Sequence, residues 1–488
     1  MSRYLAFDLG AESGRAILGT LESGRLTLEE LHRFPNTPVR VHSALYWDTL
    51  RLWHEMQQGL AVAGRERRLK LDGIGVDTWG VDFALLGTDG ALIENPRHYR
   101  DARTNGILET AFNIVPREEI FAQTGIQLMQ INTLYQLYAM RLMGSPALSN
   151  ARTLLMTPDL FNYWLTGVAR SELSIASTSQ CYNPRLGRWA TDLFDRLSLA
   201  KTILPEIVCP GTRLGSLLPA VAEAAGLGTT SVYATGCHDT ASAVAAVSAE
   251  SDSWCYISSG TWSLMGVELD APVIDGRSLA LNLTNEMGAG GKTRLLKNIA
   301  GLWLLQECRR AWALAGCEYS YETLATMAAS APPFAAIIDP DAFLEPGDMP
   351  EKICLHCQSN GQRPPDSPAS VARTIFESLV LRYRQVLESL ETLLGRKLEN
   401  IHIVGGGSRN RLLNQFVADA TDRTVIAGPS EATAMGNILI QTMGAGELSG
   451  LAEVRKIVRS SAGLETFMPR ATADWNHAYK KFRDIAQH

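Results

Sequence analysis

The chain has 488 residues, more than the roughly 250–300 residues at which single hydrophobic cores stop growing, so we expect two large domains. Hydrophobic residues make up 46% of the chain and charged residues 20%, which is typical of a folded globular protein and excludes intrinsic disorder. The net charge of -6, with no basic stripe, excludes a protein whose main partner is nucleic acid.

Two further features concern location. No apolar run reaches the roughly 18 residues that a membrane-spanning helix needs, so no membrane contact is expected. An acidic residue, Asp8, comes before any hydrophobic run long enough for an export signal. The sequence therefore predicts a cytoplasmic protein, and its eight cysteines are too few for a disulfide scaffold.

The first elements in chain order are predicted strands. Residues 4–8 and 16–19 are apolar runs joined by a segment rich in glycine and serine, which is typical of a tight hairpin. The apolar runs 73–76 and 81–86 indicate further strands.

A similar hairpin is predicted halfway along the chain, where the apolar runs 254–257 and 264–267 flank another Gly/Ser segment. One such hairpin in each half suggests a duplicated architecture with a cleft between the halves. A small-residue helix, 239–247, precedes the second hairpin, and we expect the domains to be residues 1–246 and 247–488.

The rest of the second half mixes both element types. Residues 332–368 are rich in proline and predict an irregular excursion. Apolar residues recur at three- and four-residue steps over 370–395, which indicates a long amphipathic helix, and 401–404 predicts a strand. Strands mixed with such helices predict the α/β class.

Two glycine-rich segments could bind phosphate. A carboxylate that ends a strand, Asp8, can hold Mg²⁺, and the small residues after it would let backbone N–H groups approach phosphate oxygens. Gly405, Gly406 and Gly407 follow a predicted strand, which suits close packing against a base or a phosphate. An ordinary hairpin and an ordinary turn are the alternatives.

Further motifs point to a polar substrate. Asp239, at the start of the predicted helix, could accept a proton from a hydroxyl group; alternatively it only caps the helix. The segments 77–82 and 99–105 mix acids with aromatic groups, as sugar sites do, although surface loops with salt bridges have similar compositions. The segment 288–293 is similar to a phosphate-binding P-loop, but Glu286 stands where the first glycine should be.

Together these motifs resemble the FGGY family of carbohydrate kinases, which has the actin/hexokinase/Hsp70-like ATPase fold. The family resemblance rests on Asp8-Leu-Gly, His238-Asp-Thr, the hairpin at Ser258 and the Gly405 turn, in that order. Six segments resemble the L-rhamnulose kinases of this family more closely: 75–83, 99–106, 132–137, 238–244, 258–265 and 296–306. The resemblance implies two actin-like (ribonuclease H-like) domains with a nucleotide and sugar cleft between them. It also implies transfer of phosphate from ATP, with Mg²⁺, to the 1-hydroxyl of a small ketose, L-rhamnulose.

The resemblance also implies a role for each matching position. Asp239 would be the catalytic base, and Asp8 would lie near Mg²⁺. The other implied residues contact either ATP or the sugar. Those at ATP would be Ala11, Glu12, Ser13, Gly14, Arg15, Thr261, Gln306, Gly405, Gly406 and Gly407, and those at the sugar would be Gly80, His238, Asp239, Thr240 and Asn298, with Asp77 and Trp79 as further candidates.

One residue departs from the family pattern. Glu12 stands where a small polar residue is expected, and its carboxylate would repel a triphosphate unless it points away or is offset by Arg15 or the metal. Three alternatives to the L-rhamnulose hypothesis stay open: a kinase for L-fuculose or L-xylulose, a non-catalytic actin-like nucleotide switch, and a degenerate kinase that senses sugar. We expect a monomer.

Overall fold

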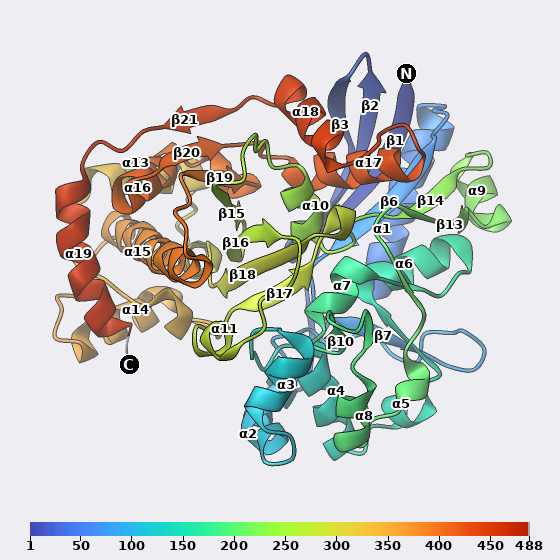
Figure 1. Cartoon of the computed structure of the whole chain (residues 1–488), viewed down its shortest axis with the longest axis horizontal. Coiled ribbons are helices and arrows are strands. Elements are labelled where there is room, and N and C mark those ends of the chain that lie inside the picture. The colour runs from blue at the N-terminus through green and yellow to red at the C-terminus, as the bar shows by residue number, and fades with distance from the viewer. Residues whose placement is uncertain (487–488) are drawn as a thin grey trace. The chain divides into compact units, whose positions relative to one another are not determined.

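A computed structural model describes residues 1–486 of the chain (Figure 1). The chain forms two units. The first unit comprises Met1–Ser248, Glu268–Leu295 and Ala432–Ser461. The second comprises Ala249–Val267, Leu296–Glu431 and the chain from Ala462 on. The chain thus passes between the units several times. The single domain boundary expected between residues 246 and 247 remains a prediction.

The first unit is built on a six-stranded sheet. The first predicted hairpin is confirmed, since β1 and β2 pair antiparallel, and β1 pairs parallel with β6 on its other side. The strands in spatial order are β13 (Thr212–Ser216), β14 (Ser231–Ala234), β6 (Gly73–Thr78), β1 (Ser2–Leu9), β2 (Ser13–Glu22) and β3 (Arg25–Pro35).

Helices cover both faces of this sheet. A side chain at Gly19 would meet Ile438 of α17 (Ala432–Gly444), whereas Ala16 meets Gly59 of α1 (Thr49–Ala61). Residues 16 and 19 of β2 point to opposite faces because side chains alternate along a strand, so α1 and α17 lie on opposite faces. This cover explains why β1 is buried over its last six residues.

The remaining elements of the first unit are mostly short. Its other helices are α2 (Ile107–Phe112), α3 (Arg117–Thr124), α4 (Thr133–Leu142), α5 (Pro146–Asn150), α6 (Thr157–Thr166), α7 (Leu173–Thr178), α8 (Thr191–Arg196), α9 (Pro219–Ala225), α10 (Asp239–Ala245), α11 (Gly276–Ala280) and α18 (Leu451–Ser461). Its minor strands are β4 (Val39–Val41), β5 (Ala44–Tyr46), β7 (Phe83–Leu86), β8 (Thr153–Met156), β9 (Ser171–Glu172), β10 (Tyr182–Asn183), β11 (Arg188–Trp189), β12 (Ile207–Val208) and β17 (Thr284–Met287).

The second unit contains the second predicted hairpin, which is also confirmed. Strands β15 and β16 pair antiparallel, and β15 pairs parallel with β19. The sheet that contains this hairpin has the order β17, β18 (Thr293–Ile299), β16 (Ser263–Leu269), β15 (Trp254–Ser259), β19 (Asn400–Val404), β20 (Thr424–Ala427) and β21 (Glu465–Phe467), of which β17 belongs to the first unit. Strands β16 and β18 run along the chain from one unit into the other.

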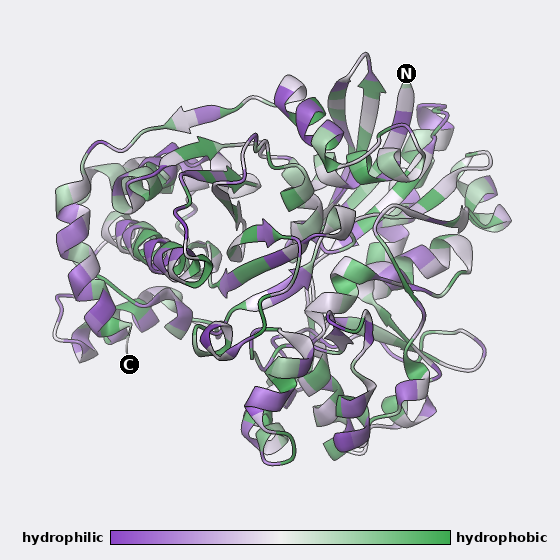
Figure 2. Ribbon diagram, in the orientation of Figure 1, coloured by the Kyte–Doolittle hydropathy of each residue, from purple (hydrophilic) through white to green (hydrophobic). Residues whose placement is uncertain are grey.

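The longest helix of the second unit is α15 (Pro368–Leu394), close to the predicted 370–395. Ser367 and Ser370 form a capping box at its start, and Gly395 ends it with a φ of 66°. Figure 2 shows hydrophilic and hydrophobic bands along its ribbon, as expected for an amphipathic helix. The other helices are α12 (Trp303–Leu314), α13 (Tyr321–Ser330), α14 (Met349–Ser359), α16 (Arg411–Thr421) and α19 (Thr472–Ile485).

Two local predictions need correction. The irregular excursion expected at 332–368 contains α14, which is capped by Asp348 and has Pro350 in its first turn, where proline is tolerated. The strand expected at 81–86 begins at Phe83, because Val81 adopts a φ of 67° that a strand does not allow. Within residues 1–486, no helix is both long and apolar enough to cross a membrane.

Candidate active site

The first group of site residues lies at the end of the β1–β2 hairpin. Asp8 is in register with Arg15 on β2 and with Asp77 on β6. The Arg15 guanidinium donates to Asp8 Oδ2 at 2.5 Å. Of the predicted phosphate-binding residues here, Glu12 is exposed at the tip of the hairpin.

The tip of this hairpin is held by backbone contacts. Gly10 N–H donates to the Ser13 carbonyl at 2.9 Å, and Asn36 donates to the Gly10 and Glu12 carbonyls at 2.8 and 2.9 Å. Gly14 is buried, and a Cβ there would lie 2.3 Å from the Phe34 ring. Close packing is therefore one reason for glycine at position 14.

Asp77 is fully buried behind Asp8. Its Oδ2 accepts from Asn437 Nδ2 at 2.5 Å, and its Oδ1 has no hydrogen-bond partner among residues 1–486. Burial first, then the Asp8 and Asp239 charges, raise the pKa of Asp77 well above its ordinary value. Three carboxylates, those of Asp8, Asp77 and Asp239, thus influence one another within the first unit.

The predicted base, Asp239, is the first residue of α10 and its side chain is 31% exposed. The helix N-cap is His238, so Asp239 does not itself occupy the cap position of the alternative interpretation. Asp239 Oδ1 accepts from Thr240 N–H at 2.5 Å and from Thr240 Oγ1 at 3.1 Å. The surrounding protein removes water from much of the Asp239 carboxylate and so raises its pKa, and the charge of His238 acts in the opposite direction.

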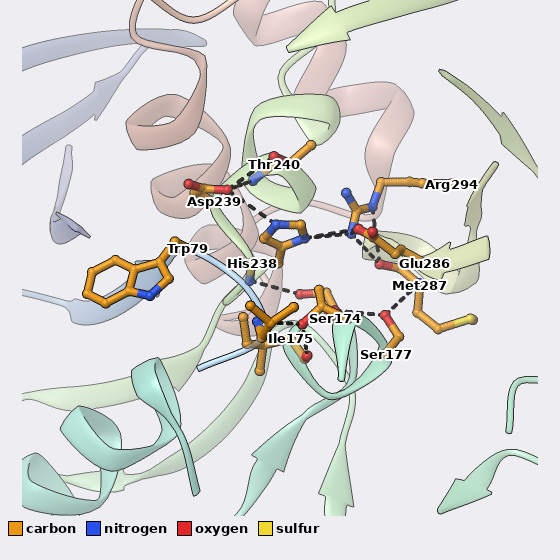
Figure 3. A network of polar contacts seen from close by, with 12 residues as sticks. Trp79, Ser174, Ile175, Ser177, His238, Asp239, Thr240, Glu286, Met287 and Arg294 are labelled. Carbon is orange, nitrogen blue, oxygen red and sulfur yellow. Dashed lines mark hydrogen bonds and ion pairs between the residues drawn. The ribbon is translucent and has the colours of Figure 1, made fainter. Parts of the chain in front are cut away.

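The His238 ring lies between two carboxylates (Figure 3). Its Nε2 lies 3.4 Å from Asp239 Oδ1, and its Nδ1 lies 3.2 Å from Glu286 Oε2. Arg294, which is fully buried, places one nitrogen 3.1 Å from His238 Nδ1 and 3.1 Å from Glu286 Oε2. The same guanidinium donates to the Met287 carbonyl.

One short helix, α7, holds the segments around the site. Its N-cap, Glu172, accepts from Cys237 N–H at 3.0 Å, and Ser174 Oγ accepts from His238 N–H at 3.2 Å. Ser177 Oγ accepts from Met287 N–H at 2.9 Å (Figure 3). Thr178 Oγ1 accepts from the Val81 N–H at 3.1 Å. The helix thus fixes the segment that carries His238, the strand that carries Glu286 and the loop after β6.

The loop after β6 carries two of the predicted sugar-site residues. A Cβ on Gly80 would lie 3.1 Å from Thr178 Oγ1, so the backbone there runs against α7. Trp79 is buried, and its indole N–H donates to Asp82 Oδ2 at 2.9 Å, as does that of Trp47 at 2.6 Å. Burial raises the pKa of Asp82 to about 6.

The second unit brings together another set of predicted residues. Gln306 on α12 donates to Thr261 Oγ1, in the β15–β16 turn, at 3.1 Å. A Cβ on Gly407 would lie 2.0 Å from Ser259 Oγ, so the glycine turn also packs against this hairpin. Gly405 has a φ of 82°, and a Cβ on Gly406 would meet no atom of residues 1–486 within 4 Å. Asn298 lies in the part of β18 that belongs to this unit, whereas the other predicted sugar residues belong to the first unit.

The predicted residues therefore fall into two sets, one in each unit. Asp8, the hairpin 11–15, Gly80 and 238–240 belong to the first unit, and Thr261, Gln306, Asn298 and the glycine turn belong to the second. The sequence did not identify Glu172, Glu286 or Arg294 as site residues. A signal was available, because Glu286 and Arg294 are charged residues within short strands, and such residues are buried only when paired.

Comparison with known proteins assigns the chain to a class. The model of the FGGY family of carbohydrate kinases matches residues 3–246 with its N-terminal domain and 255–445 with its C-terminal domain. The chain belongs to the FGGY family of carbohydrate kinases.

Full-length relatives sharpen this class. The chain is 46% identical to a rhamnulokinase of Bacteroides thetaiotaomicron, over 99% of both chains. It is 41% identical to a rhamnulokinase of Pectobacterium carotovorum over 100% of this chain and 97% of the relative, and 38% identical to one of Oceanobacillus iheyensis over 95% and 97%.

Solved structures agree on the fold. A ligand-bound xylulose kinase from Lactobacillus acidophilus matches with a TM-score of 0.83 at 15% identity, covering 100% of this chain and 98% of that one. A Plasmodium falciparum glycerol kinase with ADP matches with a TM-score of 0.77 at 14% identity, covering 100% and 98%. The predicted α/β fold with two actin-like domains is confirmed. The cleft between the domains remains a prediction.

Proposed function

We propose that this chain transfers the γ-phosphoryl group of ATP to the 1-hydroxyl of L-rhamnulose, giving ADP and L-rhamnulose 1-phosphate in the breakdown of L-rhamnose. One observation carries the substrate: relatives that align over nearly the whole chain, at up to 46% identity, are rhamnulokinases. The geometry around Asp239 supports the reaction type.

The chemistry that this chain would supply centres on Asp239. The contacts that residues 1–486 make with its carboxylate converge on Oδ1, so Oδ2 is the oxygen that would take the proton from the sugar hydroxyl. Its pKa, raised by burial, makes it a stronger base than an exposed aspartate. The alkoxide-like oxygen then attacks the γ-phosphorus as ADP leaves, a transfer that depends mainly on alignment and charge.

The other predicted residues would bind the two substrates. Gly80, His238, Thr240 and Asn298 would contact the sugar. The hairpin 11–15 would contact the phosphates. Thr261, Gln306 and the turn of Gly405, Gly406 and Gly407 would contact the nucleotide. Glu12 is exposed at the hairpin tip, where water and salt would screen its carboxylate against the charge of a triphosphate.

We also propose that Mg²⁺ is the metal and that Asp8 holds it. Residues 1–486 contain no group of three potential ligands, but Mg²⁺ usually binds one or two carboxylates, water and substrate phosphates. The charges of Asp8 and Asp239 both act on the buried Asp77, and a cation beside Asp8 would relieve the repulsion among these carboxylates. When bound, the metal would neutralise charge on the transferring phosphates.

Two other predictions from the sequence stay proposals: a monomeric state and a cytoplasmic location. L-fuculose and L-xylulose remain the alternative substrates. The xylulose kinase structures support only the fold at their low identity. Membership of a carbohydrate kinase family disfavours the nucleotide switch, which needs no sugar site.

The first experiment measures ADP release with Mg-ATP and L-rhamnulose, L-fuculose, L-xylulose, L-ribulose or glycerol. The highest kcat/KM should be on L-rhamnulose. A clear preference for another ketose would replace the substrate, and no sugar-dependent ADP release would overturn the proposal.

The second experiment tests the base. Asp239→Asn should lower kcat by about 10²–10⁴-fold, because the base is lost, while L-rhamnulose binding measured by calorimetry changes little. The matched control is Asp270→Asn, since Asp270 is an exposed partner of Lys292 outside the site. Near-normal turnover in Asp239→Asn would remove Asp239 from its role.

A further inference from the structure

The contacts around His238 leave it few protonation states. Its Nδ1 faces a carboxylate, Glu286, and a guanidinium, Arg294, while its Nε2 faces the carboxylate of Asp239. A guanidinium can only donate a hydrogen bond, and a carboxylate can only accept one. The side chains of Glu286 and Arg294 are 5% and 0% exposed, so water does not screen them.

Two states of the ring satisfy these contacts. In the first, Nδ1 has no hydrogen and accepts from Arg294, so the neutral ring carries its hydrogen on Nε2. In the second, both ring nitrogens carry a hydrogen, and the charged ring lies between the Glu286 and Asp239 carboxylates at 3.2 and 3.4 Å. Both states place a hydrogen on Nε2, which lies 3.4 Å from Oδ1 of the base.

We propose that Glu286 and Arg294 are positioning residues that fix the orientation of His238 and keep a hydrogen on its Nε2, so that Asp239 presents Oδ2 to the sugar hydroxyl. This inference rests on the proposed function for its kinetic test. Glu286 and Arg294 do not contact the substrate in this proposal, because both act through His238.

The position of the pair supports such a role. Arg294 is tied to the Met287 carbonyl, and the Met287 N–H is tied to Ser177 of α7. The same helix holds the His238 N–H through Ser174 (Figure 3). The imidazole and the pair that orients it are thus fixed to one element. An ion pair that served stability alone would not need to face the neighbour of a catalytic base.

The kinetic test is Glu286→Gln, with Glu268→Gln as the matched control. Glu268 forms a similarly buried ion pair with Arg455 in the same unit, outside the site. Glu286→Gln should lower kcat on L-rhamnulose about 10- to 100-fold and leave the KM for ATP within about threefold, since misplaced catalytic groups cost rate and His238 is not a proposed ATP contact. Glu268→Gln should keep kcat within about twofold. Equal losses of kcat in the two variants would overturn the proposal.

Two companion variants separate positioning from folding. Removing one partner of a buried pair leaves the other charge unpaired, so Glu286→Gln can unfold; Glu286→Gln/Arg294→Gln removes both charges and should show the same loss of kcat in a folded protein. In a His238→Gln background, Glu286→Gln should change kcat by less than about twofold, because its effect passes through the histidine. A full loss of kcat in that background would contradict the proposal.

A readout without catalysis distinguishes this inference from the proposed function. Nitrogen-15 NMR of the histidine rings at neutral pH, assigned with His238→Gln, should show a hydrogen on Nε2 of His238 in the wild type. An Nε2 without hydrogen would overturn the inference even in an active kinase, whereas a protonated Nε2 in a protein inactive on every sugar would overturn only the proposed function.

Discussion

The sheets of the two units share a strand arrangement but carry different residue types at corresponding positions. In each, a strand pairs antiparallel with its hairpin partner and parallel with a later strand: β1 with β2 and β6, and β15 with β16 and β19. The order extends outward in the same way, through β14 and β13 in one sheet and β20 and β21 in the other.

Equivalent positions in the two hairpins differ in charge. Asp8 and Ser258 each stand two residues before the glycine of the turn, Gly10 or Gly260. Asp8 is in register with Asp77 on the parallel strand, whereas Ser258 is in register with Val404. The first unit therefore gathers carboxylates at this edge, and the second presents hydroxyl groups and glycines. The two units thus place residues at the same edge of a similar strand arrangement, and the residue types at that edge differ in charge.

The largest expected effect comes from removing the charge at one of these equivalent positions. Asp8→Asn should lower kcat about 100-fold at a fixed Mg²⁺ concentration and raise the Mg²⁺ concentration at half-maximal rate, because the proposed carboxylate ligand of Mg²⁺ is lost. Ser258→Ala should keep kcat within about threefold. Steady-state rates over a Mg²⁺ titration check both, and comparable losses would erase the contrast between the hairpins.

Sequence patterns predicted both hairpins and α15 because the signals for these elements are local. Glycine and serine between apolar runs mark both hairpins, and the serine, proline and glycine at the ends of α15 match its caps. The prediction that a strand starts at residue 81 was wrong because tertiary contacts hold Val81 at its positive φ. Its N–H donates to Thr178 Oγ1, and its carbonyl accepts from Thr133 Oγ1. A residue that adopts an unfavourable φ for distant partners leaves no local signal.

The candidate site likewise contains residues with a local sequence signal and residues without one. Asp8 and Asp239 stand in recognisable motifs beside glycine or small residues. Glu286 and Arg294 could not be linked to His238 from the sequence, since β17 and β18 follow much later in the chain and only the fold brings them to the ring. Their charges in short strands were visible, but a single sequence cannot show which buried partner each charge has.

A second expected effect is a pH dependence that belongs to the first unit. Burial raises the pKa of Asp82 to about 6, so its protonated form favours the folded state and stability from this group is lost as pH rises from about 4 through 6. The Asp82→Asn variant has no carboxyl group at this position and therefore does not lose stability as the pH rises through this range. Its free energy of unfolding should therefore rise relative to the wild type by up to about 3 kcal/mol between pH 4 and 7, and level off above.

Urea unfolding of both proteins at several pH values measures this difference. In the wild type, Gln136 donates a hydrogen bond to Asp82 at 3.2 Å. The amide in the variant alters this contact at every pH, so we expect a constant offset in the free energy of unfolding. Only the slope of the difference with pH therefore tests the prediction. Asp270→Asn is the control of opposite sign, since the Lys292 contact lowers the pKa of the exposed Asp270. A flat difference for Asp82→Asn would mean that its carboxyl keeps an ordinary pKa in the folded protein.

The smallest expected effect tests the glycine turn of the second unit. A Cβ at Gly407 would lie 2.0 Å from Ser259 Oγ and 2.5 Å from Ser259 Cβ, whereas one at Gly406 would meet no atom of residues 1–486 within 4 Å. Gly407→Ala should therefore lower the free energy of unfolding by about 1–3 kcal/mol and raise the KM for ATP, because the hairpin that carries Thr261 must shift. Gly406→Ala should stay within about 0.5 kcal/mol. Urea unfolding and ATP titrations measure the pair. Equal behaviour of the two variants would show that the turn does not pack against the hairpin, and the second unit would then lack the close contact that in the first unit is made by Gly14 and Phe34.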